Sequence, residues 1–177
     1  AYGVDADALR GQLLARTARV VVSLAPSWLT EFPGVAPAQL IGALRRLGFA
    51  AVSETALGAQ EVSAHVARLL ADGKPRLHIS SACPTAVEYL RHRHPQFLSA
   101  VTPLRSPLLA HAGMLRRALG TETGVVFIGP CIAKKLEADR FPDLVDVALT
   151  FRELRDWLQQ ERVPLAMRQT TLRLATR

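Results

Sequence analysis

The chain has 177 residues, 49% of them apolar, and carries a formal net charge of +7 at pH 7. A chain of this length and composition can bury the core of one α/β domain or of two small lobes, and the composition excludes an intrinsically disordered protein. It has two cysteines, no apolar run near the roughly 20 residues that span a bilayer, and no basic-then-apolar start typical of a secretory signal. We therefore expect a cytoplasmic protein without a disulfide framework or a membrane span.

The positive charge comes almost wholly from arginine, since Lys74, Lys134 and Lys135 are the only lysines. The arginines stand singly or in pairs, as at 45–46 and 116–117, on the predicted polar faces of helices. A nucleic-acid site would need a clustered basic stripe interleaved with aromatic or glycine residues, and the sequence has none. The pattern favours a solvated or protein-facing surface and no nucleic-acid partner.

The first half of the chain alternates predicted helices and strands. Apolar spacing predicts helices over residues 5–16, 38–47 and 59–70, and continuous apolar runs predict strands over 19–25, 50–54 and 77–83. This alternation gives parallel β-α-β units, because the crossover between parallel strands is right-handed. The sequence thus predicts a first α/β lobe over residues 18–100, after an N-terminal helical segment at 1–17.

The second half continues this alternation. We expect a helix led by Pro84, a helix over 108–119 capped by Gly120, a strand over 125–129, a helix led by Cys131, a strand over 145–149 and a helix over 151–161. Thr150 is the expected N-cap of the last helix, with Glu153 completing a capping box. The fold class predicted is therefore α/β: a parallel β-α-β lobe, then the start of a second α/β lobe over 101–162 and a tail at 163–177.

The two cysteines occupy similar places in this pattern. Cys131 follows a buried-strand pattern and a Gly129-Pro130 break, and Cys83 follows the run that begins at Leu77. Both are expected where a strand ends and a helix begins, which is where open α/β sheets bind ligands. A helix N-terminus also favours the thiolate form, which attacks electrophiles and binds metals.

Three interpretations of the thiols remain open on this pattern. The first is two unrelated thiols in the protein interior, where free cysteine is common. The second is a catalytic nucleophile, although no histidine partner is placed beside either strand end. The third is part of a metal or cluster site. Iron–sulfur cubanes take four thiolates as a rule, so two cysteines would supply half of such a site.

Two segments carry a resemblance to a known family. Ser80-Ser81-Ala82-Cys83-Pro84 resembles the first signature of the iron-only, or [FeFe], hydrogenase catalytic domain, and the segment Gly129-Pro130-Cys131-Ile132-Ala133-Lys134-Lys135-Leu136-Glu137 resembles the second. Ala25-Pro26-Ser27, Arg105-Ser106-Pro107 and residues 146–154 are similar to further parts of that domain, in the same order. The resemblance covers about residues 18–162.

The resemblance implies a cofactor and a set of site residues. In this family a [4Fe–4S] cubane is bridged by a cysteine to a two-iron subsite with CO and cyanide ligands, between two α/β lobes, and the site interconverts protons, electrons and H2. By resemblance, Cys83 and Cys131 are two of the four cubane ligands, Lys134 donates to a cyanide, and Glu137 belongs to the proton route. The pocket would be lined by Ala25, Pro26, Ser27, Ser81, Ser106, Pro130 and Lys134.

Several positions depart from the family pattern. Ala82 stands where catalytic members have a cysteine that relays the proton, His65 where a glutamate is expected, and Leu108 where a glutamine is usual. No cysteine follows Cys131, so the third signature and its two thiolates are absent.

The resemblance therefore predicts one part of an iron-only hydrogenase-like domain, for H2 and proton redox chemistry or for H2 or redox sensing. The alternative is a cluster-free or partial-cluster relative that acts in protein interaction or iron–sulfur assembly. The partners implied are a ferredoxin or iron–sulfur electron-transfer domain and the missing C-terminal half of the domain, in the same or another chain. We expect Cys83 and Cys131 to lie near one another across a cleft, with an exposed apolar face that could also dimerise.

Overall fold

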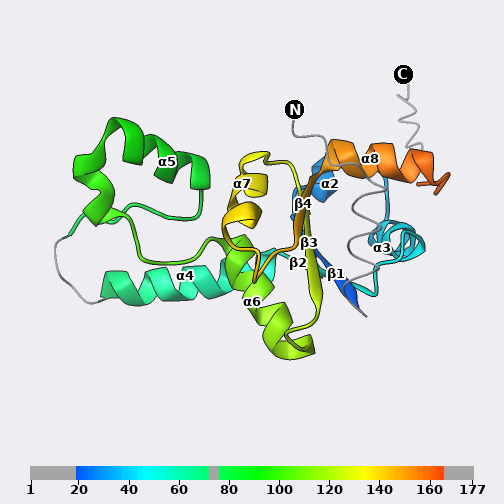
Figure 1. Ribbon diagram of the computed structural model, residues 1–177, viewed down its shortest axis with the longest axis horizontal. Helices are drawn as coiled ribbons and strands as arrows, with labels where there is room; N and C mark the ends of the chain where they lie inside the picture. Colours follow the sequence, from blue (N-terminus) through cyan, green and yellow to red (C-terminus); the bar gives the residue numbers. More distant parts are fainter. Residues whose placement is uncertain (1–18, 72–75, 166–177) are drawn as a thin grey trace, which may run out of the picture.

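The protein is described by a computed structural model, which covers residues 19–71 and 76–165. Its centre is a four-stranded parallel sheet with strand order β2-β1-β3-β4 (Figure 1). The strands are β1 (Val20–Leu24), β2 (Ala51–Glu54), β3 (Gly124–Gly129) and β4 (Val147–Thr150). The α/β class and the parallel sheet predicted from the sequence are confirmed.

The two central strands, β1 and β3, lie in the middle of the hydrophobic core. Every residue of β1 and β3 is buried, and the strands pair in register with Val22 opposite Val126. A continuous apolar run is what a parallel strand needs when helices cover both faces of the sheet. These two runs in the sequence therefore determine the centre of the fold.

Helices cover both faces of the sheet (Figure 1). One layer holds α2 (Trp28–Glu31), α3 (Pro37–Arg46) and α8 (Phe151–Gln160), and the other holds α6 (Pro107–Leu119) and α7 (Ala133–Arg140). In the first layer, Phe49 and Trp157 meet edge to face with ring centroids 5.7 Å apart. Such aromatic contacts join the ends of the layer into one apolar core.

The predicted helix ends are confirmed at three places. Thr150 Oγ1 accepts a hydrogen bond from the Glu153 amide at 3.2 Å, and Glu153 Oε2 accepts one from the Thr150 amide at 2.7 Å, which completes the capping box. Gly120 ends α6, and Pro84 begins α5 (Pro84–Arg93). Short signals in the sequence, a capping box, a glycine and a proline, thus located these helix ends.

One expectation needs correction. Residues 77–83 do not form a sheet strand, since Ile79 makes only an isolated bridge to Val101 and Leu77 is 61% exposed. Cys83 therefore does not follow a strand of the sheet. On either side of the domain boundary predicted near residue 100, the chain contributes to one sheet, because β3 pairs directly with β1. The segments expected as a helix at 5–16 and as a tail beyond 165 lie outside the described residues.

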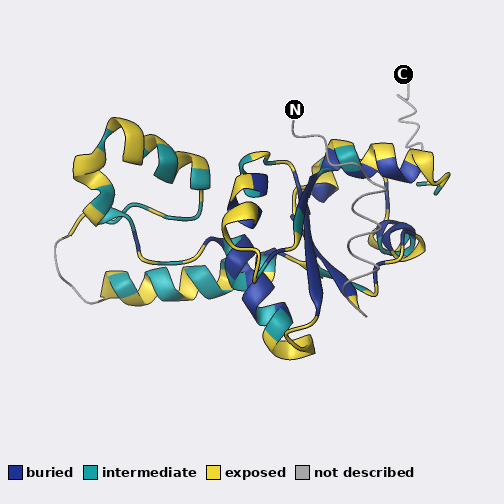
Figure 2. Ribbon diagram, in the orientation of Figure 1, coloured by how far each residue is buried: buried dark blue, intermediate teal, exposed yellow. Residues whose placement is uncertain are grey.

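A separate unit lies to one side of the sheet. We call residues 76–101, with α5 and the 3-10 helix η1 (Pro95–Ala100), the outer arm, and residues 19–55 and 102–165 the sheet body. No residue of the outer arm is buried (Figure 2). The arm therefore lacks a hydrophobic core of its own.

The long helix α4 (Ala56–Ala71) extends from the sheet body toward the outer arm (Figure 1). Gly58 is its only buried residue, and a Cβ added there would lie 2.1 Å from the Pro107 carbonyl oxygen. Glycine is needed because α4 and α6 approach too closely for any side chain. Within residues 19–71 and 76–165, no helix is long and apolar enough to cross a membrane.

Candidate metal centre

Cys131 belongs to the sheet body. It lies two residues after β3, and its carbonyl oxygen accepts a hydrogen bond from the Lys134 amide at 3.1 Å in the first turn of α7. A Cβ at Gly129 would come within 2.9 Å of the Ala25 Cβ, and the Ala25 amide donates to the Ile128 carbonyl at 2.8 Å. The loop after β1 thus lies against the segment that carries Cys131, at the carboxyl ends of neighbouring parallel strands.

Cys83 belongs to the outer arm. It is the N-cap of α5, and its carbonyl accepts a hydrogen bond from the Val87 amide at 3.2 Å. Its side chain is exposed, whereas Cys131 is half-buried, and both are free thiols. The prediction that each cysteine stands at the start of a helix is confirmed for Cys83 and holds within two residues for Cys131.

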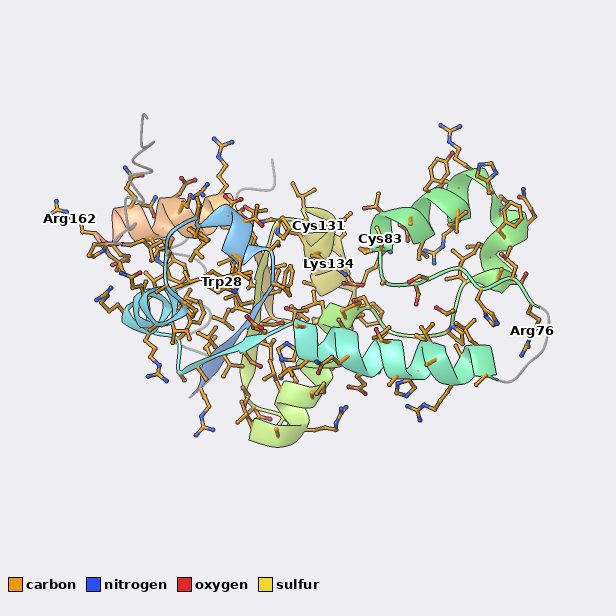
Figure 3. All side chains as sticks on the ribbon, turned by 180° about the vertical axis from the view of Figure 1, so that it is seen from behind. Trp28, Arg76, Cys83, Cys131, Lys134 and Arg162 are labelled. Carbon is orange, nitrogen blue, oxygen red and sulfur yellow. The ribbon has the colours of Figure 1, made fainter. Side chains whose placement is uncertain are left out.

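Lys134 connects the two segments. Its Nζ donates to the Ala82 carbonyl at 3.4 Å, on the residue before Cys83, and to Glu137 Oε2 at 2.6 Å. Figure 3 shows Cys83, Cys131 and Lys134 together where α5 faces α7. The amine is thus held between the arm and a carboxylate of its own helix.

Glu137 is the centre of a buried polar cluster. It is 8% exposed, and its Oε2 also accepts a hydrogen bond from Ser106 Oγ at 2.9 Å. Ser106 Oγ in turn caps α6 by accepting from the Leu109 amide. Ser106, Lys134 and Glu137, three residues predicted for the site, therefore form one connected network between α6 and α7.

The other residues predicted to line the pocket are divided between the outer arm and the sheet body. Ser81 lies at the base of the outer arm, where its hydroxyl donates to the Leu104 carbonyl at 2.7 Å. Ala25 is buried at the end of β1, while Pro26, Ser27 and Pro130 are exposed at the same edge of the sheet. Most predicted residues thus gather at one edge, and Ser81 reaches it from the arm.

A pocket of ≈ 410 Å³ lies between the outer arm and the sheet body. Its lining includes Ser81, Ser106 and Glu137 from the predicted set, together with Glu88 and Arg140. The volume falls within the usual range of small-molecule sites, about 300 to 1,000 Å³.

The chemistry of the donors fits a soft metal centre in part. Thiolates are the ligands of iron–sulfur clusters, and a cubane takes about four of them. Among the described residues no group of three or more His, Cys, Asp or Glu side chains gathers to hold a metal ion. Cys83 and Cys131 therefore fit half of a cubane donor set.

The structure shows the hydrogen-bond partners of two histidines, His111 and His65. His111, which the sequence did not single out, is 1% exposed; its Nδ1 lies 2.8 Å from Ser23 Oγ and its Nε2 2.9 Å from Ser53 Oγ. Burial lowers the pKa of His111 below its ordinary value. No sequence signal distinguishes such a histidine from a surface one. His65 donates from Nδ1 to the Glu61 carbonyl on α4 and lines a separate pocket of ≈ 180 Å³.

Comparisons with known proteins identify relatives of this chain. The sequence profile of the family described as the C-terminal domain of the iron only hydrogenase large subunit matches residues 18–173. The NADP-reducing hydrogenase subunit HndD of Solidesulfovibrio fructosivorans is 31% identical over 83% of this chain and 30% of its own length. The cytosolic Fe-S cluster assembly factor NAR1 of Sclerotinia sclerotiorum is 31% identical over 48% of this chain and 15% of its own.

Solved structures match the fold. A structure from a study of oxygen inactivation of [FeFe]-hydrogenase superposes with a TM-score of 0.74 and 26% identity, over 92% of this chain and 49% of that chain. The chain thus spans about half the length of that solved structure and about a third of HndD. It belongs to the family formed by the C-terminal domain of the iron-only hydrogenase large subunit.

Proposed function

We propose that Cys83 and Cys131 are two of the four thiolate ligands of a [4Fe–4S] cubane in a hydrogenase-like domain. One observation carries the proposal: two thiols from distant parts of the chain stand at the starts of α5 and α7, and Lys134 links the two segments by its contact with the Ala82 carbonyl. Positive side chains and helix N-termini stabilise an anionic cluster.

The remaining thiolates come from polypeptide that supplies the second half of the domain, in the same or another chain. The surface of α7 supports this. Its charged side chains Lys135 and Glu137 point inward and are buried, while Ile132 and Leu136 are 61% and 45% exposed. This reversal of the usual pattern leaves an apolar ridge beside Cys131, and such ridges mark contact surfaces. Without its cover, the ridge is expected to make the chain dimerise.

The role we favour is redox or H2 sensing, or slow H2 chemistry, with a ferredoxin or iron–sulfur domain as electron partner in the cytoplasm. When bound, the cubane and a two-iron subsite would supply the electrons and the proton-binding metal centre. The Ala82 side chain has no exchangeable proton, so it cannot relay one. The Lys134 ammonium has three N–H donors and uses two of them on Glu137 Oε2 and the Ala82 carbonyl, which leaves the third to donate to a cyanide.

A second function is iron–sulfur assembly. It is favoured by the similarity to NAR1, whose name is that of a cytosolic assembly factor, over the part of the chain that the match covers. The two functions differ in what happens to the cluster. An assembly protein passes its cluster to an acceptor protein that lacks one, whereas a redox or sensing domain keeps it.

The cysteine proposal can be tested by reconstituting the chain without oxygen, with iron, sulfide and a small thiol able to fill the open positions. We expect the wild-type chain to retain iron and acid-labile sulfide, and Cys83→Ala and Cys131→Ala each to lose most of both. Thr85→Ala, an exposed change beside Cys83 on α5, is the matched control and should behave as wild type.

Two results would contradict the proposal. One is a wild-type chain that retains no sulfide-bound iron, and the other is a single cysteine variant that retains as much as the wild type. Infrared spectra test the incomplete donor set separately. We expect no CO and cyanide bands from the 177 residues alone, because two thiolates cannot hold the full active-site cluster.

A further inference from the structure

The outer arm is held to the sheet body by polar contacts. None of its residues is buried, and a pocket of ≈ 410 Å³ separates α5 from α6 and α7. The contacts that cross from the arm include Ser81 with Leu104 and Thr102 at its base, Lys134 with the Ala82 carbonyl, and Arg140 with Glu88. Hydrophobic packing therefore fixes the position of Cys83 less firmly than a buried core would.

Glu88 joins two arginines through one oxygen. Its Oε1 accepts from Arg91 at 2.9 Å, within α5, and from Arg140 at 2.6 Å, across the pocket on α7. Its Oε2 lies 3.7 Å from His92 Nε2. The carboxylate thus makes one contact that stabilises its own helix and one that connects the arm to the body.

We propose that the Glu88–Arg140 ion pair is a clamp that positions Cys83 relative to Cys131. The two partners stand on the two helices whose first turns follow the two thiols: Glu88 five residues after Cys83 on α5, and Arg140 nine residues after Cys131 on α7. A contact between the middle of α5 and the last residue of α7 restrains how the two helices lie relative to each other. It therefore restrains how far apart the thiols stand before any cluster binds.

The clamp acts by pre-organisation and not by contact with the metal. The Arg140 side chain is 51% exposed and that of Glu88 is 26% exposed, and ion pairs of this exposure shift an equilibrium by about two- to five-fold. If α5 were docked by a hydrophobic core, such a shift in the docking equilibrium would be small compared with the free energy of apolar burial. In an arm without buried residues it is a large share of what keeps α5 docked.

This inference rests on the proposed cluster site for its functional meaning, and the test separates the two. The variant is Arg140→Gln, which breaks the contact between helices, and the matched control is Arg91→Gln, which breaks the contact within α5. Two quantities are measured in each: amide hydrogen exchange of α5 without iron, and the rate at which a chelator removes iron from the reconstituted chain.

We expect Arg140→Gln to speed both α5 exchange and iron loss about two- to five-fold, and high salt to bring the wild type toward the variant. Arg91→Gln should leave iron loss unchanged. Combined with Glu88→Gln, Arg140→Gln should add little further, because both remove the same contact.

Equal effects of Arg140→Gln and Arg91→Gln on iron loss would overturn the clamp. If the wild type retains no iron, the cluster proposal fails instead, and α5 exchange still decides whether the clamp exists: no change in Arg140→Gln would refute it. Exchange in β3 should be the same in all variants, which excludes a general loss of stability.

Discussion

The sheet body and the outer arm are built on different physical principles. The body has a continuous core in which Val22, Val126 and Leu154 are completely buried, whereas the arm has no buried residue at all. Cys131 belongs to the first region and Cys83 to the second. The candidate site is thus divided between a rigid part, which burial stabilises, and a part whose position depends on polar contacts and on whatever binds between them.

This division gives the cluster a structural role as well as a chemical one. A cubane held by both cysteines would connect the arm to the body more firmly than the clamp does, since metal binding contributes directly to the stability of the state that binds it. The arm should therefore be the region that responds to cluster binding.

The largest expected effect is on the rate of H2 evolution, and it comes from residue 82 in the outer arm. In an assembly completed with the second half of the domain, Ala82→Cys should raise H2 evolution at least tenfold, because a positioned acid–base group contributes roughly 10² to 10⁴ in rate. Ser80→Cys is the control, since it adds a thiol to the same segment two residues away. No increase, with the two-iron subsite intact by infrared spectroscopy, would show that another group carries the proton.

The next largest effect compares the cost of removing an apolar side chain from the sheet body with the cost of removing one from the outer arm. Leu154→Ala should lower the free energy of unfolding by about 2 to 5 kcal/mol, because the side chain is completely buried in the body. Leu77→Ala in the arm, where the side chain is 61% exposed, should change it by less than about 0.5 kcal/mol. Urea unfolding of both variants measures the difference, and similar losses would mean that the arm has a core after all.

The attachment of α4 gives a smaller effect. Gly58→Ala should cost about 1 to 3 kcal/mol, because the added methyl overlaps the Pro107 carbonyl and forces α4 away from α6. Gly42→Ala, in α3 with no atom within 4 Å of the new Cβ, should instead be neutral or stabilise by up to about 1 kcal/mol. Thermal unfolding distinguishes these signs, and a neutral Gly58→Ala would argue against the close contact.

The smallest effect is a pH dependence that belongs to the body. Because burial lowers the pKa of His111, the folded state keeps the imidazole neutral while the unfolded state takes up a proton as the pH falls below about 6.5. Stability should therefore be complete above that pH and fall as the pH drops toward the lowered pKa. His111→Gln should reduce this slope in unfolding measurements between about pH 7.5 and about pH 5, and an unchanged slope would assign it to other groups.

Local signals in the sequence predicted the central strands and several helix ends well. The continuous apolar runs of β1 and β3, the capping box at Thr150 and the first helical position of Pro84 each contain the relevant physics within a few residues. The family resemblance added the site residues, and the structure brings Ser106, Lys134 and Glu137 into one network.

The sequence was a poorer guide where structure depends on distant partners. A strand needs a neighbour, and Ile79 finds only an isolated bridge to Val101, so the apolar pattern at 77–83 did not become a sheet strand. The pairing of β1 with β3 joins segments about a hundred residues apart, so no local pattern could show that both regions expected as lobes contribute to one sheet. The Glu88–Arg140 contact likewise depends on tertiary placement alone.

The division of the site between two regions is tested most directly by hydrogen exchange of the cluster-loaded and cluster-free chain, comparing α5 with β3. If Cys83 and Cys131 hold one cluster, loading should slow exchange throughout α5 and leave β3 unchanged, because the body is already fixed by its core. Retained iron and sulfide with no slowing of α5 would mean that Cys83 is not a ligand, and would contradict a cluster shared between the arm and the body.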